Sequence, residues 1–161
     1  MSKKISVLFV CMGNICRSPT AHGVFERLLQ QQGLEQLVEV DSAGTHAYHI
    51  GEAPDRRSQQ AARERGYDLG HLRARRVEGS DFEDFDYVLA MDDDNYRLLE
   101  AQCPGEHRQK LQMFLDYARN FSEREVPDPY YGGERGFQHV LDLVEDAATG
   151  LIEDIRSRHL D

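Results

Sequence analysis

The chain has 161 residues, of which 40% are hydrophobic and 30% charged, and its formal net charge is −10. This composition is typical of a globular protein of one domain, residues 1–161, and the acidic balance disfavours nucleic acid and anionic membranes as partners. Three cysteines without paired Cys-X2-Cys clusters argue against both a disulfide scaffold and a structural zinc site.

The N-terminal segment predicts a buried strand followed by a sharp loop. Residues 5–10 are mostly β-branched or bulky and apolar, which favours a strand covered on both faces. This run is too short for the apolar region of a signal peptide, so we expect a cytoplasmic protein. In the following segment, residues 11–17, Gly13 and Asn14 are the residue types that most readily accept positive φ. We therefore expect the loop to curl with its N–H groups pointing inward.

A helix should follow this loop, with Ser18 as its N-cap, Pro19 in its first turn and Gly33 at its end. A strand that leads through a curled loop into a helix N-terminus forms an anion-binding cradle. Cys11 would lie at the mouth of this cradle, where the positive field favours the nucleophilic thiolate. Arg17 can offer a planar guanidinium to two oxygens of a phosphate. These parts match phosphoryl transfer to sulfur.

The rest of the chain predicts alternating helices and strands, and hence right-handed crossovers and a small parallel sheet. Cys11 would then lie at the carboxyl edge of the sheet, where such folds bind ligands. The polar loop at 116–133 is long enough to suggest a function, and it contains Asp128 between two prolines. The expected elements are strands at 37–43, 85–91 and 110–115, and helices from Asp55 to about 65, from Asp92 to about 102 and from about 134 to 158.

Residues 53–76 contain seven arginines against three acidic residues, a local balance of +4 in an acidic chain. The simplest interpretation is a solvated helix face and loop. The alternative is that Arg56 and Arg57 steer phosphorylated partners toward the cysteine loop.

The motif Cys11-Met12-Gly13-Asn14-Ile15-Cys16-Arg17-Ser18, together with Asp128-Pro129-Tyr130-Tyr131, resembles the low molecular weight protein tyrosine phosphatase family. The length and the position of the cysteine loop also fit, so the resemblance covers essentially the whole chain. It implies a single-domain, three-layer α/β fold with a four-stranded parallel sheet in the order 2-1-3-4. It also implies hydrolysis of phosphotyrosine in proteins, and of small aryl phosphates, through a phosphocysteine intermediate without a metal or cofactor.

The resemblance implies a role for each motif residue. Cys11 would be the nucleophile, Arg17 would hold the phosphate, and Asp128 would be the general acid. Asp92 is the next candidate for the acid only because it is acidic and also follows a strand. The remaining roles are phosphate binding by Met12, Gly13, Asn14, Ile15, Cys16, Arg17 and Ser18, a substrate cleft of Met12, Tyr48, Tyr130 and Tyr131, and support of the loop by Asn14, Ser18 and His71. His71 would lie behind the loop, hydrogen-bonded to Asn14 or Ser18.

Three other functions fit the sequence less well. An arsenate reductase of this fold would need resolving cysteines near the third strand, where this chain has Ala90 and Asp94 and only Cys103 nearby. A phosphoarginine phosphatase goes with a small polar residue in place of Ile15. A catalytically silent phosphotyrosine-binding module should lack the nucleophile or the acid. The expected partners are therefore tyrosine-phosphorylated proteins, a tyrosine kinase among the candidates, and the protein is expected to be a monomer or a weak homodimer.

Cys16 has no obvious role in the displacement. Most free cysteines behave as small buried apolar residues, and this is the simplest interpretation. However, an exposed thiolate at Cys11 would be open to peroxide, and a second thiol in the same loop could condense with its sulfenic acid. The alternative is therefore a protective disulfide between Cys11 and Cys16.

Overall fold

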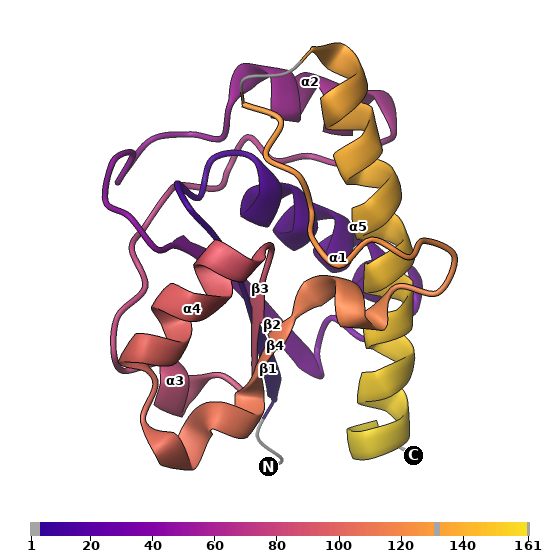
Figure 1. Ribbon diagram of the computed structural model, residues 1–161. Coiled ribbons are helices and arrows are strands. Elements are labelled where there is room, and N and C mark those ends of the chain that lie inside the picture. The colour runs from indigo at the N-terminus through magenta and orange to yellow at the C-terminus, as the bar shows by residue number, and fades with distance from the viewer. Residues whose placement is uncertain (1–3, 131–132, 161) are drawn as a thin grey trace.

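A four-stranded parallel sheet with the order β2-β1-β3-β4 runs through the centre of the protein (Figure 1). The computed structural model describes residues 4–130 and 133–160. The strands are β1 (Ile5–Cys11), β2 (Val38–Gly44), β3 (Tyr87–Ala90) and β4 (Leu111–Met113). The predicted fold class and strand order are both confirmed.

Helices cover both faces of this sheet (Figure 1). Helices α1 and α5 pack against each other on one face, α3 and α4 lie on the other, and α2 packs beside α5. The helix bounds are α1 (Arg17–Gln31), α2 (Arg56–Glu64), α3 (Asp81–Asp84), α4 (Asp93–Gln102) and α5 (Glu134–Ile155), with the short helices η1 (Gly105–Lys110), η2 (Phe114–Tyr117) and η3 (Arg156–Leu160).

Strand β1 forms the centre of two hydrophobic clusters. Val7 and Phe9 belong to the cluster that α1 and α5 cover, whereas Leu8 and Val10 belong to the cluster that includes Leu99 of α4. Side chains of a strand point alternately to its two faces, so a strand buried on both sides has to be apolar throughout. This is why residues 5–10 show no polar alternation, and why β1 ends in a buried cysteine.

Several local predictions hold, and others need correction. Helices α2 and α4 begin where the sequence predicts, and the side chains of Asp55 and Asp92 cap them. Helix α3 was not predicted, because four residues carry too little periodicity to be recognised. Strand β3 begins only at Tyr87, because the Asp86 side chain accepts a hydrogen bond from the Ser6 N–H.

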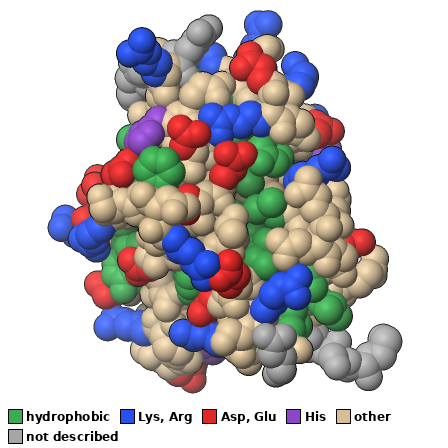
Figure 2. Space-filling view, turned by 90° about the vertical axis from the view of Figure 1, so that its right-hand side faces the viewer, with side chains coloured by type: hydrophobic (Ala, Val, Ile, Leu, Met, Phe, Trp, Pro, Cys, Tyr) green, Lys and Arg blue, Asp and Glu red, His purple; other side chains and the backbone are tan. Residues whose placement is uncertain are grey.

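The surface beside α5 carries charges of both signs, interspersed with hydrophobic side chains (Figure 2). Among the described residues, no helix combines the length and apolar character needed to cross a membrane.

Gly150 allows α5 to approach the chain that follows β4. A Cβ atom at this position would overlap the backbone carbonyl of Tyr117, and backbone cannot move aside as a flexible side chain can. We therefore expect Gly150→Ala to lower the free energy of unfolding by about 2 to 3 kcal/mol. Gly79→Ala is the control, since a Cβ there meets no atom within 4 Å and should be neutral or slightly stabilising. Urea unfolding measures both changes, and equal stabilities would contradict the close approach.

Candidate active site

The loop between β1 and α1 is curled by Asn14, whose φ of 58° lies in the left-handed region. Its side chain bonds in two directions: Oδ1 accepts from the backbone N–H of Arg75 at 3.0 Å, and Nδ2 donates to Ser18 Oγ at 2.8 Å. Asparagine tolerates positive φ better than most residues and can also form these bonds, which glycine cannot. Asn14 thus sets the curl and fixes it to the segment before α3.

The end of β2 forms one side of this loop. The N–H of Thr45 donates to the Cys11 carbonyl at 2.9 Å, and the N–H of His46 donates to the Met12 carbonyl at 3.0 Å. A Cβ on Gly44 would lie 2.7 Å from the Met12 carbonyl oxygen, so only glycine permits this approach. Sequence reasoning did not identify this role of Gly44.

The Cys11 side chain is held among hydrogen-bond donors. Its Sγ accepts from the Asn14 backbone N–H at 3.3 Å and lies 3.0 Å from Ser18 Oγ. Because Asn14 donates to Ser18 Oγ, the hydroxyl proton of Ser18 can point toward the sulfur at 3.0 Å, which is closer than its other acceptor, the Ala43 carbonyl at 3.5 Å. This arrangement stabilises negative charge on the sulfur.

The predicted N-cap role of Ser18 is wrong. Helix α1 begins at Arg17, and Cys16 occupies the N-cap position without a side-chain hydrogen bond to the helix. The Ser18 hydroxyl bonds instead to Asn14 and Cys11. Serine is a favourable N-cap residue, but the hydroxyl of Ser18 contacts the sulfur of Cys11 instead of capping the helix.

Arg17 is buried, with 3% of the residue exposed. Residues that follow β3 and β4 hold its guanidinium. Nη1 donates to Asp92 Oδ2 at 2.6 Å and to the Val126 carbonyl at 3.0 Å. Burial alone would lower the pKa of Arg17, but the negative charges of Cys11 and Asp92 outweigh it and raise that pKa above its ordinary value. Asp92 therefore holds the guanidinium in place, a role that the sequence did not indicate.

Asp128 lies close to this arginine, with Oδ2 3.8 Å from Arg17 Nη2. Its other oxygen, Oδ1, accepts from the Tyr130 backbone N–H at 3.0 Å, so the carboxylate has a defined orientation. Tyr130 is partly exposed and lines the same cavity as Cys11, whereas Tyr131 falls outside the described residues.

These residues surround a small cavity of about 180 Å³. Tyr48 lies at its rim with 71% of the residue exposed, and its ring stacks on His46 at a centroid distance of 5.1 Å. His49 also lines the cavity and was not singled out from the sequence. The lining residues are Cys11, Met12, Gly13, Ile15, Cys16, Arg17, Tyr48, His49, Asp128 and Tyr130.

The predicted position of His71 is wrong. Its side chain is 57% exposed and lies 3.7 Å from Glu26, not behind the loop. The hydrogen bond to Asn14 that was expected from His71 comes instead from the backbone N–H of Arg75. The buried histidine of this region is His22 on α1, whose Nδ1 lies 3.0 Å from Ser42 Oγ. The sequence did not indicate this role, because His22 lies on a face of α1 whose other residues are typical of the core.

Cys16 is a free, buried cysteine at the start of α1. Burial is the main reason that the pKa of its thiol is raised to about 12, and the nearby carboxylates of Asp55 and Asp128 act in the same direction. Cys16 is therefore a thiol at neutral pH, in contrast to the charge-stabilising surroundings of Cys11.

The chain is similar to known proteins over nearly its whole length. The family model described as low molecular weight phosphotyrosine protein phosphatase matches residues 6–160. The low molecular weight phosphotyrosine protein phosphatase of Schizosaccharomyces pombe is 45% identical over 156 residues, covering 96% of this chain and 99% of its relative. A crystal structure of a protein tyrosine phosphatase from Entamoeba histolytica superposes with a TM-score of 0.93 at 44% identity, covering 96% of this chain and 98% of that one. The structure of YfkJ from Bacillus subtilis gives a TM-score of 0.92 at 37% identity, with 98% of each chain covered.

His22 makes stability depend on pH. Burial, the largest effect, and the charge of His71 lower the pKa of His22 to about 4, whereas Asp41 opposes the shift. The unfolded chain has an ordinary histidine pKa near 6.5 and binds more protons, so this residue makes stability rise from pH 4 to 6.5. Across that window, the free energy of unfolding of the parent should rise by roughly 2 to 3 kcal/mol more than that of His22→Gln. Denaturant titrations at several pH values measure the difference. His71→Gln, at an exposed position, should keep most of the parent's slope, and equal slopes for parent and His22→Gln would contradict the assignment.

Proposed function

Because the chain belongs to the low molecular weight phosphotyrosine protein phosphatase family, we propose that it hydrolyses phosphotyrosine in proteins, and small aryl phosphates, through a phosphocysteine at Cys11. The observation that carries this proposal is the setting of the sulfur. Cys11 Sγ lies among the Asn14 N–H, the Ser18 hydroxyl and the buried Arg17, at the carboxyl end of the central strand. One phosphatase domain would span residues 1–161.

The first step is attack of the Cys11 thiolate on phosphorus. The S–P bond forms as the bond to the tyrosine oxygen breaks, and Asp128 gives its proton to the leaving phenolate. In the second step water attacks the phosphocysteine, Asp128 takes the proton of the water, and the S–P bond breaks to release phosphate and the thiolate. Arg17 and the N–H groups of residues 12–17 stabilise the equatorial oxygens in both steps.

The cavity suits an aromatic ester better than the alternatives. Ile15 lines it with an apolar side chain, which favours a phenyl ring over the guanidinium of phosphoarginine. For arsenate reduction, Cys103 would have to reach Cys11. The two belong to hydrophobic clusters on opposite faces of the sheet, so the sheet separates them. The proposed partners are tyrosine-phosphorylated proteins of the cytoplasm, acted on by a monomer or a weak homodimer.

Asp128 should matter most for poor leaving groups, because an acidic phenol departs without a proton. Asp128→Asn should therefore reduce kcat for phosphotyrosine at least tenfold more than kcat for an aryl phosphate of low phenol pKa. Steady-state kinetics on both substrates without added metal measure the ratio. Cys11→Ser is the control and should abolish turnover of both. An equal slowing of the two substrates by Asp128→Asn would falsify the acid assignment, and full activity of Cys11→Ser would exclude the phosphocysteine.

Cys16 is proposed to protect Cys11 from irreversible oxidation. Peroxide converts Cys11 to its sulfenic acid, which condenses with the Cys16 thiol to give a disulfide and water. Because the attacking species is a thiolate and burial raises the pKa of Cys16 to about 12, the disulfide should form faster as the pH rises from 7 to 9. Peptide mapping after mild peroxide treatment should find a Cys11–Cys16 cross-link that a dithiol reverses, whereas Cys16→Ser should accumulate sulfinic acid at Cys11. Sulfinic acid without a cross-link in the unmutated protein would leave Cys16 with a structural role alone.

A further inference from the structure

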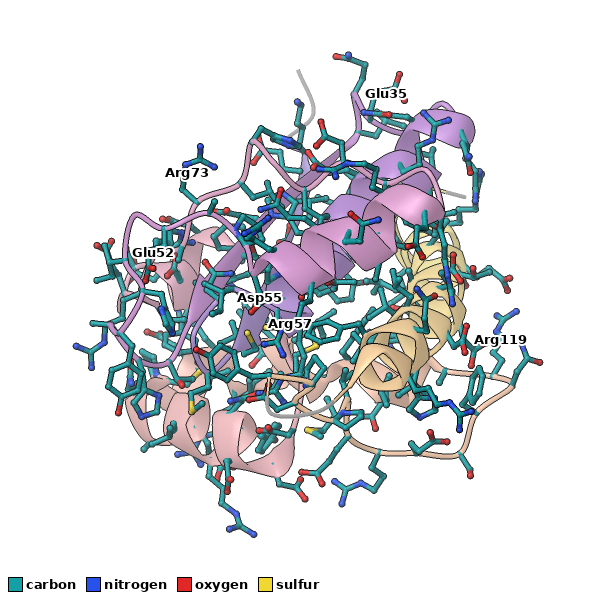
Figure 3. All side chains as sticks on the ribbon, turned by 90° about the horizontal axis from the view of Figure 1, so that it is seen from above. Glu35, Glu52, Asp55, Arg57, Arg73 and Arg119 are labelled. Atoms are coloured by element: carbon teal, nitrogen blue, oxygen red, sulfur yellow. The ribbon has the colours of Figure 1, made fainter. Side chains whose placement is uncertain are left out.

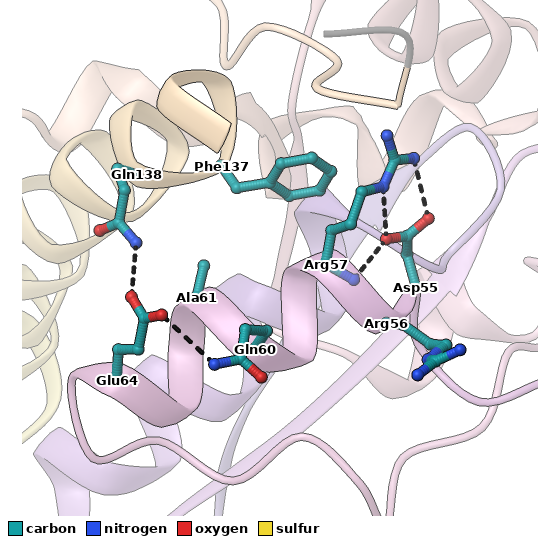
Figure 4. Close-up of a pocket in the computed structure, with 8 residues that line it drawn as sticks. All are labelled: Asp55, Arg56, Arg57, Gln60, Ala61, Glu64, Phe137 and Gln138. Atoms are coloured by element: carbon teal, nitrogen blue, oxygen red, sulfur yellow. Dashed lines mark hydrogen bonds and ion pairs between the residues drawn. The ribbon is translucent and has the colours of Figure 1, made fainter. Parts of the chain in front are cut away.

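A second, larger cavity lies between α2 and the start of α5. Its volume is about 840 Å³, more than four times the 180 Å³ of the cavity at Cys11. Ala61 and Phe137, both buried, form its apolar floor. At one end, Gln60 and Gln138 both donate to the Glu64 carboxylate, which closes the groove with a polar wall (Figure 4). We call this cavity the α2–α5 groove.

The other end of the groove adjoins the catalytic cavity through Arg57. The guanidinium carbon of Arg57 lies 4.8 Å from the centre of the Phe137 ring in the groove and 5.4 Å from the centre of the Tyr130 ring, which lines the catalytic cavity. Nη2 of Arg57 also donates to the Tyr130 carbonyl at 2.8 Å. Arg57 lines the groove and Tyr130 lines the catalytic cavity, so the contact between these two residues is where the two cavities adjoin.

The side chain of Arg57 is held by hydrogen bonds within the protein. Its backbone N–H and its Nε donate to Asp55 Oδ1 at 2.8 and 3.2 Å, and Nη2 lies 3.1 Å from Oδ2 (Figures 3 and 4). Partial burial acts in the opposite direction, but these hydrogen bonds lower the pKa of Asp55 below its ordinary value. Asp55 therefore stays ionised, and Arg57 acts as a fixed wall of the groove.

Arg56 is the cation at this end that remains available to a ligand. It lines the groove and is exposed, and within residues 4–130 and 133–160 its side chain makes no ion pair. Other arginines of the same segment are used internally: Arg65 bonds to Glu145 of α5, and Arg75 bonds to Asp81. In a chain of net charge −10, an arginine without an ion-pair partner in this groove attracts acidic groups.

We infer that the α2–α5 groove binds the polypeptide segment that flanks the phosphotyrosine of a protein substrate, with an acidic side chain on Arg56 and an apolar one against Ala61 and Phe137. The inference rests on the proposed function. The catalytic cavity has room for one aromatic side chain, so the rest of a protein substrate must lie on the surface around it. The groove has the size of a ligand site, and its mixed lining offers an apolar floor with a few placed polar groups.

The test compares two phosphotyrosine peptides of equal length, one with aspartate and leucine on both sides of the phosphotyrosine and one with lysine and serine. The unmutated protein should prefer the acidic peptide in kcat/KM, mainly through KM, and the preference should weaken as salt shortens the range of the charge interaction. Arg56→Glu should reduce kcat/KM for the acidic peptide roughly fivefold, because a surface charge pair is replaced by repulsion. p-Nitrophenyl phosphate, which cannot reach the groove, should be hydrolysed as before.

Two further variants separate a local site from general effects. Arg73→Glu makes the same change in net charge at a position well away from Asp55 and Arg57 (Figure 3), and it should keep the preference. Gln60→Trp fills the groove from an exposed position on α2 and should raise KM for the acidic peptide without affecting p-nitrophenyl phosphate. An equal loss in Arg56→Glu and Arg73→Glu, or no preference in the unmutated protein, would overturn the groove assignment while leaving the phosphatase intact. Absence of hydrolysis of all three substrates would instead count against the proposed function.

Discussion

The left-handed conformation of Asn14 is the constraint on which the candidate site depends. It turns the chain within the few residues between a buried strand and a helix, and the N–H of Asn14 thereby reaches the sulfur of Cys11. The side chain then holds both Ser18 and the segment around Arg75. A glycine could adopt the same φ but would lose both side-chain bonds, leaving the curl without support.

The charged side chains of the site form ion pairs at the carboxyl edge of the sheet. Arg17 is buried, and a buried cation is costly unless it is paired and hydrogen-bonded. Asp92 and the Val126 carbonyl meet that need at one nitrogen of the guanidinium, while the other faces Asp128. A buried ion pair is weak evidence of stabilisation, so we interpret the role of this pair as orienting the guanidinium of Arg17. Under the proposed function, the guanidinium is already oriented before a phosphate binds, so little reorganisation is left for the reaction.

Much of this arrangement could be predicted from sequence because it is encoded locally. The apolar run of β1, the Gly13-Asn14 turn, and the caps of α2 and α4 each depend on residues close in the chain. What could not be predicted depends on contacts between distant residues. The pairing of Arg17 with Asp92 spans 75 positions and that of Asn14 with Arg75 spans 61. The predictions for Ser18 and His71 were wrong for the same reason. A hydroxyl or an imidazole has several possible partners, and only the fold selects among them. The strand order and the proposed acid role of Asp128 came from the family resemblance and not from local rules.

The segment from Val126 to Tyr130 connects these features, because it is fixed at both ends. The Val126 N–H donates to the Met91 carbonyl at the end of β3, and its own carbonyl accepts from Arg17. At the other end, the Tyr130 carbonyl accepts from Arg57. Asp128 lies between the two attachments, so its position is set by the contact of Val126 with Arg17 and by the contact of Tyr130 with Arg57. Asp55 in turn holds Arg57, so one series of contacts joins the start of α2 to the segment that carries Asp128. Because these contacts fix the wall of the groove, we expect a polypeptide bound there to change KM and to leave the chemical step as it is.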